Sequence, residues 1–239
     1  MAGWPDETVD LVTTSPPYFV GKEYETGWTW EGYSRLMADL YQQTYRLLQP
    51  GRYCVINFGD LHNSGGRMYP ADVPSVYPAA VAHWEWGRAA GFDLQATRIW
   101  RKQFARVALG HVVNKRPRNG FDFEHIWTWR KPGRDGEEWC ADRRLSQRGV
   151  LGDAWSSPAR IDRHCAAFPV ELPTWAINVY SREKGEVVLD PFGGSLTTLV
   201  AAHRTGRRGW AIELDPQYLQ TGLERLKTEL AQLTLVEDA

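Results

Sequence analysis

Short apolar runs alternate with helix-length amphipathic segments along this chain, and that alternation limits the folds it can adopt. The β-branched run at 8–14 ends at two consecutive prolines, which lack backbone donors and favour an extended Ser15. Residues 31–49 carry apolar side chains at helical spacing, with Pro50 and Gly51 expected to end the helix. Residues 52–60 are predicted to form a buried strand. This order favours a parallel sheet with helices packed on its faces.

The last third of the chain shows the same order more clearly. Strands are predicted at 185–190 and 209–215, with a helix between them that ends at Gly206. A second amphipathic helix is expected over 216–233. The chain therefore closes on a strand, helix, strand, helix succession, as an α/β fold requires.

The middle of the chain is less regular. A helix ending at Gly91 is predicted after a loop at 60–80, and strands are predicted at 92–102 and 123–131. Residues 131–163 are polar and rich in arginine, without clear periodicity. We therefore expect one domain that carries an inserted recognition region.

Composition excludes several classes of protein. The 239 residues have a net charge of −1, so the total charge gives no sign of a nucleic-acid partner. Cys54, Cys140 and Cys165 lie far apart, which argues against a disulfide framework or a structural zinc and favours a reducing compartment. No signal sequence or membrane span is apparent, and a cytoplasmic, nucleoid-associated location is expected.

The segment 190–198 has the pattern of a ligand-binding turn. A strand ends at Asp190, adjacent glycines follow, and a helix begins. Glycines permit close approach of a ligand, and a helix start favours an anion. Glu213 lies 20 residues after Gly193, where doubly wound folds place an acid against ribose hydroxyls. The alternative is a structural turn with an unrelated surface acid, and no phosphate-binding loop of the nucleoside triphosphate type is present.

Two motifs together resemble a known family. "TSPPY" at 14–18 and "DPFGGSLTT" at 190–198 are similar to motifs of the amino-methylating DNA methyltransferases that use S-adenosylmethionine. The first motif precedes the second, as in the circularly permuted group called beta. Further matches are "LLQPGRYCVINFGD", "FEHIWTWRKPG", "HCAAFPVELPTWAINVYS" and "GWAIELDPQY", so that the resemblance covers most of residues 8–230.

The resemblance implies a Rossmann-like methyltransferase fold in circularly permuted order. It has a mostly parallel central sheet with helices on both faces. Residues 1–239 would then form a single domain, with a catalytic half at 1–130, a target-recognition segment at about 131–163 and a cofactor-binding half at 164–239.

The family's functional residues carry over by position. The catalytic loop corresponds to Ser15, Pro16, Pro17 and Tyr18. The cofactor turn corresponds to Asp190, Phe192, Gly193, Ser195 and Thr197, with Glu213 as the ribose acid. The segment that closes the methionine end of the cofactor pocket corresponds to Phe168, Pro169 and Glu171. The alternative for this last segment is a loop entering a helix with a buried phenylalanine.

The chain departs from the family in two places. Leu196 replaces a usual glycine, and its side chain either crowds the cofactor or packs outward. A strand that precedes the catalytic strand in many relatives is not found, and residues 234–238 could supply it from the other end, with Glu237 or Asp238 near the adenine. A frayed tail is the alternative.

The resemblance also implies a chemistry. Ser15 Oγ and the Pro16 carbonyl would accept hydrogen bonds from an exocyclic amine, and Tyr18 would stack on the flipped base. Alternatively, Tyr18 is a strand-end aromatic with its hydroxyl in water. Serine at the first loop position favours cytosine N-4 over adenine N-6. Ring-carbon methylation is disfavoured because no cysteine follows a proline. Methylation of RNA or of a protein amide, and a catalytically weak binding module, remain as alternatives.

Two basic clusters are candidates for phosphate contact. Between 94 and 121 the chain has seven basic residues and no acid: Arg98, Arg101, Lys102, Arg106, Lys115, Arg116 and Arg118. A second cluster holds Arg143, Arg144, Arg148, Arg160 and Arg163. Such clusters form a DNA-binding stripe or simply a solvated face. Double-stranded DNA is the expected partner, and the resemblance allows an independent restriction endonuclease and a homodimer.

Overall fold

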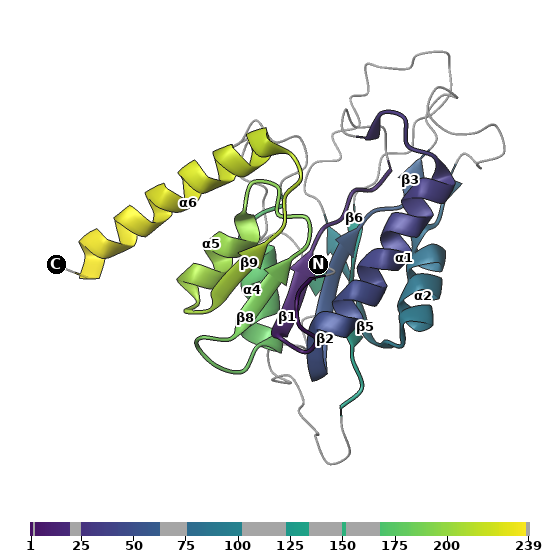
Figure 1. Cartoon of the computed structure of the whole chain (residues 1–239), viewed down its shortest axis with the longest axis horizontal. Coiled ribbons are helices and arrows are strands. Elements are labelled where there is room, and N and C mark those ends of the chain that lie inside the picture. Colours follow the sequence, from purple (N-terminus) through teal and green to yellow (C-terminus); the bar gives the residue numbers. More distant parts are fainter. Residues whose placement is uncertain are drawn as a thin grey trace.

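The computed structural model describes residues 1, 3–19, 25–62, 76–101, 123–133, 150–151 and 168–237. Its main sheet has seven strands in the order β7-β5-β6-β2-β1-β8-β9 (Figure 1). These strands are β1 (Val9–Thr14), β2 (Leu48–Phe58), β5 (Asp93–Arg101), β6 (Phe123–Arg130), β7 (Val150–Leu151), β8 (Val187–Asp190) and β9 (Arg208–Ala211). Within the loop predicted at 60–80, β3 (Leu61–His62) and β4 (Val76–Tyr77) pair separately.

The strand directions confirm the mostly parallel sheet that the motifs implied. Strand β1 is parallel to both β2 and β8, and β8 is parallel to β9. Strand β6 runs antiparallel between β2 and β5, while β7 is parallel to β5. Because β1 and β8 are parallel neighbours, the loops that leave their carboxyl ends emerge side by side.

Helices cover both faces of the sheet, as expected. Helices α1 (Trp30–Leu47) and α2 (Ala79–Ala90) lie on one face, and α4 (Glu171–Tyr180) and α5 (Thr197–Arg204) lie on the other (Figure 1). Alternate strand residues enter two separate cores: Val12 and Cys54 pack on the α1 side, and Leu11 and Val55 pack on the α4 side. Burial on both faces explains why the central strands are apolar runs without alternation.

Two glycines predicted to end helices have different roles. Gly91 follows α2 in the left-handed conformation, with φ of 101°, and confirms its prediction. Helix α1, in contrast, ends at Leu47, and β2 begins at Leu48, so Pro50 and Gly51 lie inside the strand. The Gly51 amide donates to the Lys131 carbonyl at 3.0 Å. Because Gly51 pairs with Lys131, just after β6, strand β2 begins earlier in the chain than the sequence indicated.

The C-terminal segment corrects a second expectation. Helix α6 (Pro216–Glu237) continues through 234–237, so the strand proposed for 234–238 is wrong for these residues, and Asp238 lies outside the described part. The helix begins where Asp215 Oδ1 accepts a hydrogen bond from the Gln217 amide at 2.7 Å. Leucines at helical spacing continue past Gly222, and no later glycine or proline interrupts the helix before 237.

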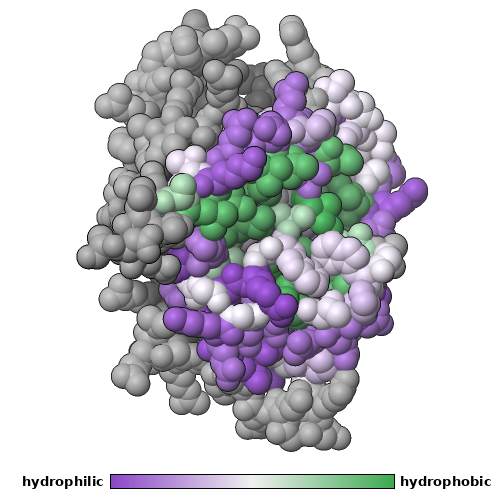
Figure 2. All heavy atoms as spheres, turned by 60° about the vertical axis from the view of Figure 1, so that its left-hand side comes forward, coloured by the Kyte–Doolittle hydropathy of each residue, from purple (hydrophilic) through white to green (hydrophobic). Residues whose placement is uncertain are grey.

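Helix α6 lies beyond the β9 edge of the sheet and exposes an apolar stripe. Its exposed leucines are Leu219, Leu223 and Leu230, and Leu214 just before it is 97% exposed. Figure 2 shows hydrophobic residues running across this side of the molecule between hydrophilic borders. Among the described helices, none combines the length and the apolar character that crossing a membrane requires.

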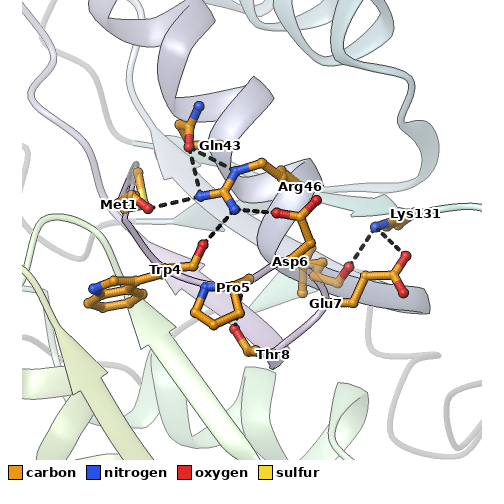
Figure 3. A network of polar contacts seen from close by, with 10 residues as sticks. Met1, Trp4, Pro5, Asp6, Glu7, Thr8, Gln43, Arg46 and Lys131 are labelled. Carbon is orange, nitrogen blue, oxygen red and sulfur yellow. Dashed lines mark hydrogen bonds and ion pairs between the residues drawn. The ribbon is translucent and has the colours of Figure 1, made fainter.

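The N-terminal segment is fixed to α1 by one arginine (Figure 3). Arg46 donates to the carbonyls of Trp4 at 2.7 Å and Met1 at 2.8 Å, and forms an ion pair with Asp6. Its guanidinium also donates to Gln43 one turn earlier on the helix, at 3.1 Å. These contacts hold the start of β1 against the end of α1. They thereby fix the position of the strand that leads to Ser15.

Candidate active site

The loop after β1 is anchored by side chains of the α1 region. The Tyr33 hydroxyl donates to the Pro17 carbonyl at 3.0 Å. Phe19 has a positive φ of 57°, and its ring stacks on the Tyr33 ring with 5.1 Å between the ring centroids. The Phe19 amide donates to Glu25 Oε1 at 2.8 Å. Ser15, Pro17 and Tyr18 are half-buried, and Pro16 is buried. The loop thus leaves the sheet in one fixed conformation, which the two prolines stiffen.

A polar network lies behind this loop. Ser15 Oγ and the Tyr18 hydroxyl are 2.8 Å apart, and the Tyr18 hydroxyl donates to Glu124 Oε2 at 3.1 Å. Asn57 Nδ2 donates to the same Glu124 oxygen at 2.7 Å and to the Tyr18 hydroxyl. Burial, and to a lesser extent the charge of Glu124, raise the pKa of Tyr18 well above its usual value. Tyr18 is therefore a phenol at neutral pH and does not present its hydroxyl to bulk water.

Two members of this network were not among the predicted site residues. Asn57 on β2 is 1% exposed and Glu124 on β6 is 8% exposed. The register of β2 with β6 pairs Asn57 with Ile126, which places Glu124 two residues along the neighbouring strand. A polar side chain inside an apolar strand is costly unless hydrogen-bonded. The polar residues within the apolar stretches "CVINF" and "FEHIW" therefore indicated that Asn57 and Glu124 need hydrogen-bond partners. The sequence did not indicate that they would be partners of each other and of Tyr18.

Asp190 connects the catalytic loop to the cofactor turn. It is fully buried at the end of β8, and its Oδ1 accepts from the Thr14 hydroxyl at 2.6 Å and the Phe192 amide at 3.1 Å. Its Oδ2 accepts from the Thr198 hydroxyl at 2.6 Å. Burial raises the pKa of Asp190 to about 6. Asp190 was predicted to bind the cofactor, and that role stays a prediction. Its observed contacts join the end of β1 to the start of α5.

Glu213 is held beside the same turn. Its Oε2 accepts from the Gly194 amide at 2.6 Å, and its Oε1 accepts from the Asp215 amide at 2.8 Å. Each carboxylate oxygen keeps a further lone pair for a donor. A fixed acid with spare acceptor capacity, at the carboxyl end of β9 and next to a glycine turn, fits the hydroxyls of a ribose.

Leu196 is buried against α6, which favours the second of its two alternatives. Its φ is 56°, and its side chain is buried against α6, where a Cβ added to Gly222 would lie 2.5 Å from Leu196 Cγ. The left-handed conformation explains why a glycine suits this position, since it costs other residues about 1–2 kcal/mol. Burial of the leucine side chain offsets that cost.

The other predicted cofactor residues are distributed around the turn. The Gly193 amide donates to the Ile212 carbonyl at 2.8 Å. Ser195 and Thr197 are buried at the start of α5, where Thr197 Oγ1 accepts from Arg225 at 2.9 Å. Phe192 packs partly buried on the α1-side core. The predicted cofactor contacts of these residues stay predictions.

The segment before α4 has the form of a loop entering a helix. The Pro169 carbonyl accepts from the Leu172 amide at 3.1 Å, and Phe168 packs on the α4-side core. Glu171 is exposed in the first helical turn. The loop entering a helix matches the alternative given for this segment, but Phe168 is half-buried and not buried. Closure over the methionine end of a cofactor stays a prediction.

The structure removes Arg98 from the predicted basic stripe. Its side chain is 7% exposed, donates to the Tyr180 hydroxyl at 2.9 Å and lies over the Trp175 ring at 5.2 Å. Arg98 alternates into the face that α4 covers, so it is buried beneath this helix and is not available to a phosphate at the surface. Arg101 is the last residue of β5. The remaining predicted basic residues lie outside the described residues: Lys102, Arg106, Lys115, Arg116, Arg118, Arg143, Arg144, Arg148, Arg160 and Arg163.

Comparison with known proteins agrees with this geometry. The family model described as DNA methylase, of the N-6 and N-4 amino type, matches residues 9–224. The chain belongs to this family. The described sheet accordingly carries both motifs of a DNA methylase at adjacent strand ends, and S-adenosylmethionine is the cofactor of the family.

Individual relatives resemble this DNA methylase over nearly its whole length. It is 25% identical to the type II beta methyltransferase M.BslI of Bacillus sp. (strain NEB-606), over 94% of this chain and 26% of that protein. It is 26% identical to the type II methyltransferase M.BglI of Bacillus subtilis, over 93% of this chain and 81% of that one. A DNA modification methylase of Thermus thermophilus, solved with S-adenosyl-L-methionine, shares 30% identity with a TM-score of 0.70, covering 95% and 89% of the two chains. The chain thus spans about a quarter of M.BslI and most of the other two.

Proposed function

We propose that this DNA methylase transfers a methyl group from S-adenosylmethionine to the exocyclic N-4 of a cytosine flipped out of double-stranded DNA. The observation that carries the proposal is the hydrogen bond between Thr14 and Asp190. It ties the residue before Ser15 to the turn that belongs to the cofactor half. An acceptor for an amino group is therefore held next to the segment proposed to hold the methyl donor.

Residues of the turn and of the β9 end would hold the cofactor. Glu213 would bind the ribose hydroxyls, and the start of α5 with Phe192 would border the rest of the nucleoside. Phe168 and Pro169 would close the methionine end. When bound, S-adenosylmethionine supplies an electrophilic methyl on a sulfonium.

The catalytic loop would orient the amino group. The lone pair of an exocyclic amine is delocalised into the ring, so the amine is a weak nucleophile. Acceptance of its two hydrogens by Ser15 Oγ and the Pro16 carbonyl favours a pyramidal nitrogen, and the diproline keeps that carbonyl in place. Alignment of this kind can lower a barrier by about 7–11 kcal/mol. Base flipping costs a few kcal/mol, and stacking on Tyr18 would return about 1–3 kcal/mol.

DNA contact is proposed for the basic residues without Arg98. Arg101, Lys102, Arg106, Lys115, Arg116, Arg118, Arg143 and Arg144 would bind phosphates, which position a duplex without specifying its sequence. The family resemblance also supports a role in a restriction-modification system. An endonuclease of the same specificity, a homodimer and a nucleoid location stay predictions.

Mass spectrometry of nucleosides tests the proposed function. Duplex DNA is incubated with the protein and S-adenosylmethionine and then digested to nucleosides. We expect N-4-methylcytosine, because serine occupies the first loop position. Adenine methylated at N-6 would replace the cytosine proposal by its nearest alternative. Absence of both products, with cofactor stabilisation of the folded state also absent, would support an inert module.

A further inference from the structure

The polar network behind the loop determines the direction of its hydrogen bonds. Its members besides Ser15 itself come from three segments, and only Tyr18 and Asn57 contact Ser15 directly. Ser15 Oγ lies 2.8 Å from the Tyr18 hydroxyl, which lies 3.1 Å from Glu124 Oε2. An ionised carboxylate only accepts hydrogen bonds, so the single Tyr18 proton points to Glu124. Tyr18 consequently has no proton left for Ser15.

Asn57 completes the assignment. Its amide nitrogen lies 2.7 Å from Glu124 Oε2 and also contacts the Tyr18 hydroxyl, which uses both of its protons. The opposite orientation of the amide would place two acceptor oxygens in contact. The contact of Asn57 Nδ2 with Ser15 Oγ, at 3.4 Å, is longer than the other two. The Tyr18 oxygen then has one lone pair for Asn57 and one for Ser15.

We propose that the Tyr18 hydroxyl and the Glu124 carboxylate position the Ser15 hydroxyl as a hydrogen-bond acceptor toward the substrate, a role separate from stacking by the Tyr18 ring. With its proton directed to Tyr18, Ser15 Oγ offers only lone pairs to a base in the site. A serine could otherwise donate to a carbonyl as readily as accept from an amine. The network therefore selects bases that carry an amino group over those that carry a carbonyl at the same position. The proposal rests on the proposed amino-methyltransferase function but not on which base is methylated.

Nucleoside binding measures this selection without catalysis. The probes are deoxycytidine against deoxyuridine, and deoxyadenosine against deoxyinosine, each pair differing in an amino or carbonyl group. Binding is followed by saturation-transfer NMR with S-adenosylhomocysteine present. We expect the wild-type protein to favour one amino nucleoside over its carbonyl partner by about tenfold, as one hydrogen bond made or reversed implies.

Three variants separate orientation from general structural effects. Tyr18→Phe removes the acceptor for the Ser15 proton, and the amino preference should fall to about onefold. Glu124→Gln keeps the shape but removes the charge that fixes the Tyr18 proton, and we expect an intermediate preference. The double variant should equal Tyr18→Phe, because Glu124 acts through Tyr18. Tyr45→Phe on α1 and Glu85→Gln on α2 are matched controls that should keep the wild-type preference.

Kinetics give a second readout. The rate of a single methylation turnover should fall at least tenfold in Tyr18→Phe, with DNA affinity changed less than about twofold. An unchanged amino preference in Tyr18→Phe would overturn the proposal, as would failure of all four nucleosides to bind the wild-type protein. Equal weakening of amino and carbonyl nucleosides would also overturn it, since that pattern indicates only a damaged pocket. Methylation of adenine in place of cytosine would contradict the proposed function alone, because the second nucleoside pair still measures the Ser15 orientation.

Discussion

The cofactor turn and the polar network behind the catalytic loop are held by contacts of very different range along the chain. In the turn, Asp190 bonds to Thr198 eight residues away, and Gly194 bonds to Glu213 across 19 residues. In the loop, Tyr18 bonds to Glu124 across 106 residues. A strand-turn-helix-strand unit can specify the first kind of contact by itself, whereas the second kind exists only after more distant strands of the sheet have paired.

One hydrogen bond joins these two regions. Thr14 and Asp190 are separated by 176 residues, and their side chains meet because β1 and β8 are parallel neighbours. Two buried groups, one on α2 and one at the end of β8, also respond to acid in opposite ways. Burial lowers the pKa of His83 to about 3 and raises the pKa of Asp190 to about 6. We therefore expect substitutions in the catalytic loop, at Asp190 and at His83 to have separable effects on turnover, on stability and on the pH dependence of stability.

The largest expected effect is on turnover and concerns the catalytic loop alone. Ser15→Ala should lower the single-turnover rate by about 10²-fold or more, since it removes one oriented acceptor at the reacting amine. Affinity for S-adenosylmethionine, measured by calorimetry, should stay within about twofold. Ser34→Ala on α1 is the matched control. Weaker cofactor binding with an unchanged rate would reverse the roles assigned to the two regions.

Asp190→Ala should affect both regions at once. The change leaves two buried threonine hydroxyls and one amide without their acceptor, and we expect the free energy of unfolding to fall by about 3 kcal/mol. Cofactor affinity should weaken as well, because the start of α5 loses its tie to β8. Urea titration measures the first effect and calorimetry the second. Asp215→Ala, which removes only the cap of α6, should cost about 1 kcal/mol, and equal losses would contradict the connecting role of Asp190.

The contributions of His83 and Asp190 to stability should change with acid in opposite directions. Neutral His83 in the folded state, against a usual pKa near 6.5, gives stability that is lost as the pH falls below about 6.5 toward 3. Between pH 7.5 and 4.5 this loss is about 2–3 kcal/mol at roughly 1.4 kcal/mol per pH unit. His83→Gln should lower stability at pH 7.5 but reduce the loss on acidification by that amount, measured by urea titration at both pH values.

The contribution of Asp190 to stability should depend on pH with the opposite sign to that of His83. Its raised pKa means that the folded state binds a proton more readily than the unfolded chain, so its contribution improves as the pH falls from about 6 toward 3.8. Asp190→Asn removes this gain, and the loss of stability between pH 7.5 and 4.5 should become larger than in the wild type. A shallower dependence in Asp190→Asn would contradict the assigned direction.

The smallest effect concerns the turn and α6. Gly222→Ala should destabilise the protein by about 1–3 kcal/mol, because the new Cβ would lie 2.5 Å from Leu196 Cγ. In the Leu196→Gly background the same change should cost much less, as the conflicting side chain is gone. Thr221→Ala, one residue earlier on α6, serves as control. Additive losses would show that the two residues do not share this contact.

The sequence predicted the elements and motifs more reliably than the contacts between them. The helix ending at Gly91 and the turn after Asp190 were predicted because their signals lie within a few residues. The position of Pro50 and Gly51 in a strand was missed, since it depends on pairing with Lys131. Arg98 was assigned to the basic stripe because it lies in a segment rich in basic residues. In the structure, its position on β5 places its side chain beneath α4.

What the sequence by itself determined is the alternation of strands and helices, the two motifs and the family they indicate. These depend on spacing, turn chemistry and residue type along short stretches. Only the tertiary structure decided that Asp190 holds Thr14, that Leu196 packs on Gly222, and that Ser15 has Tyr18, Asn57 and Glu124 behind it. The physical reason is that strand order and register set these neighbours, and neither can be read from any one stretch of the chain.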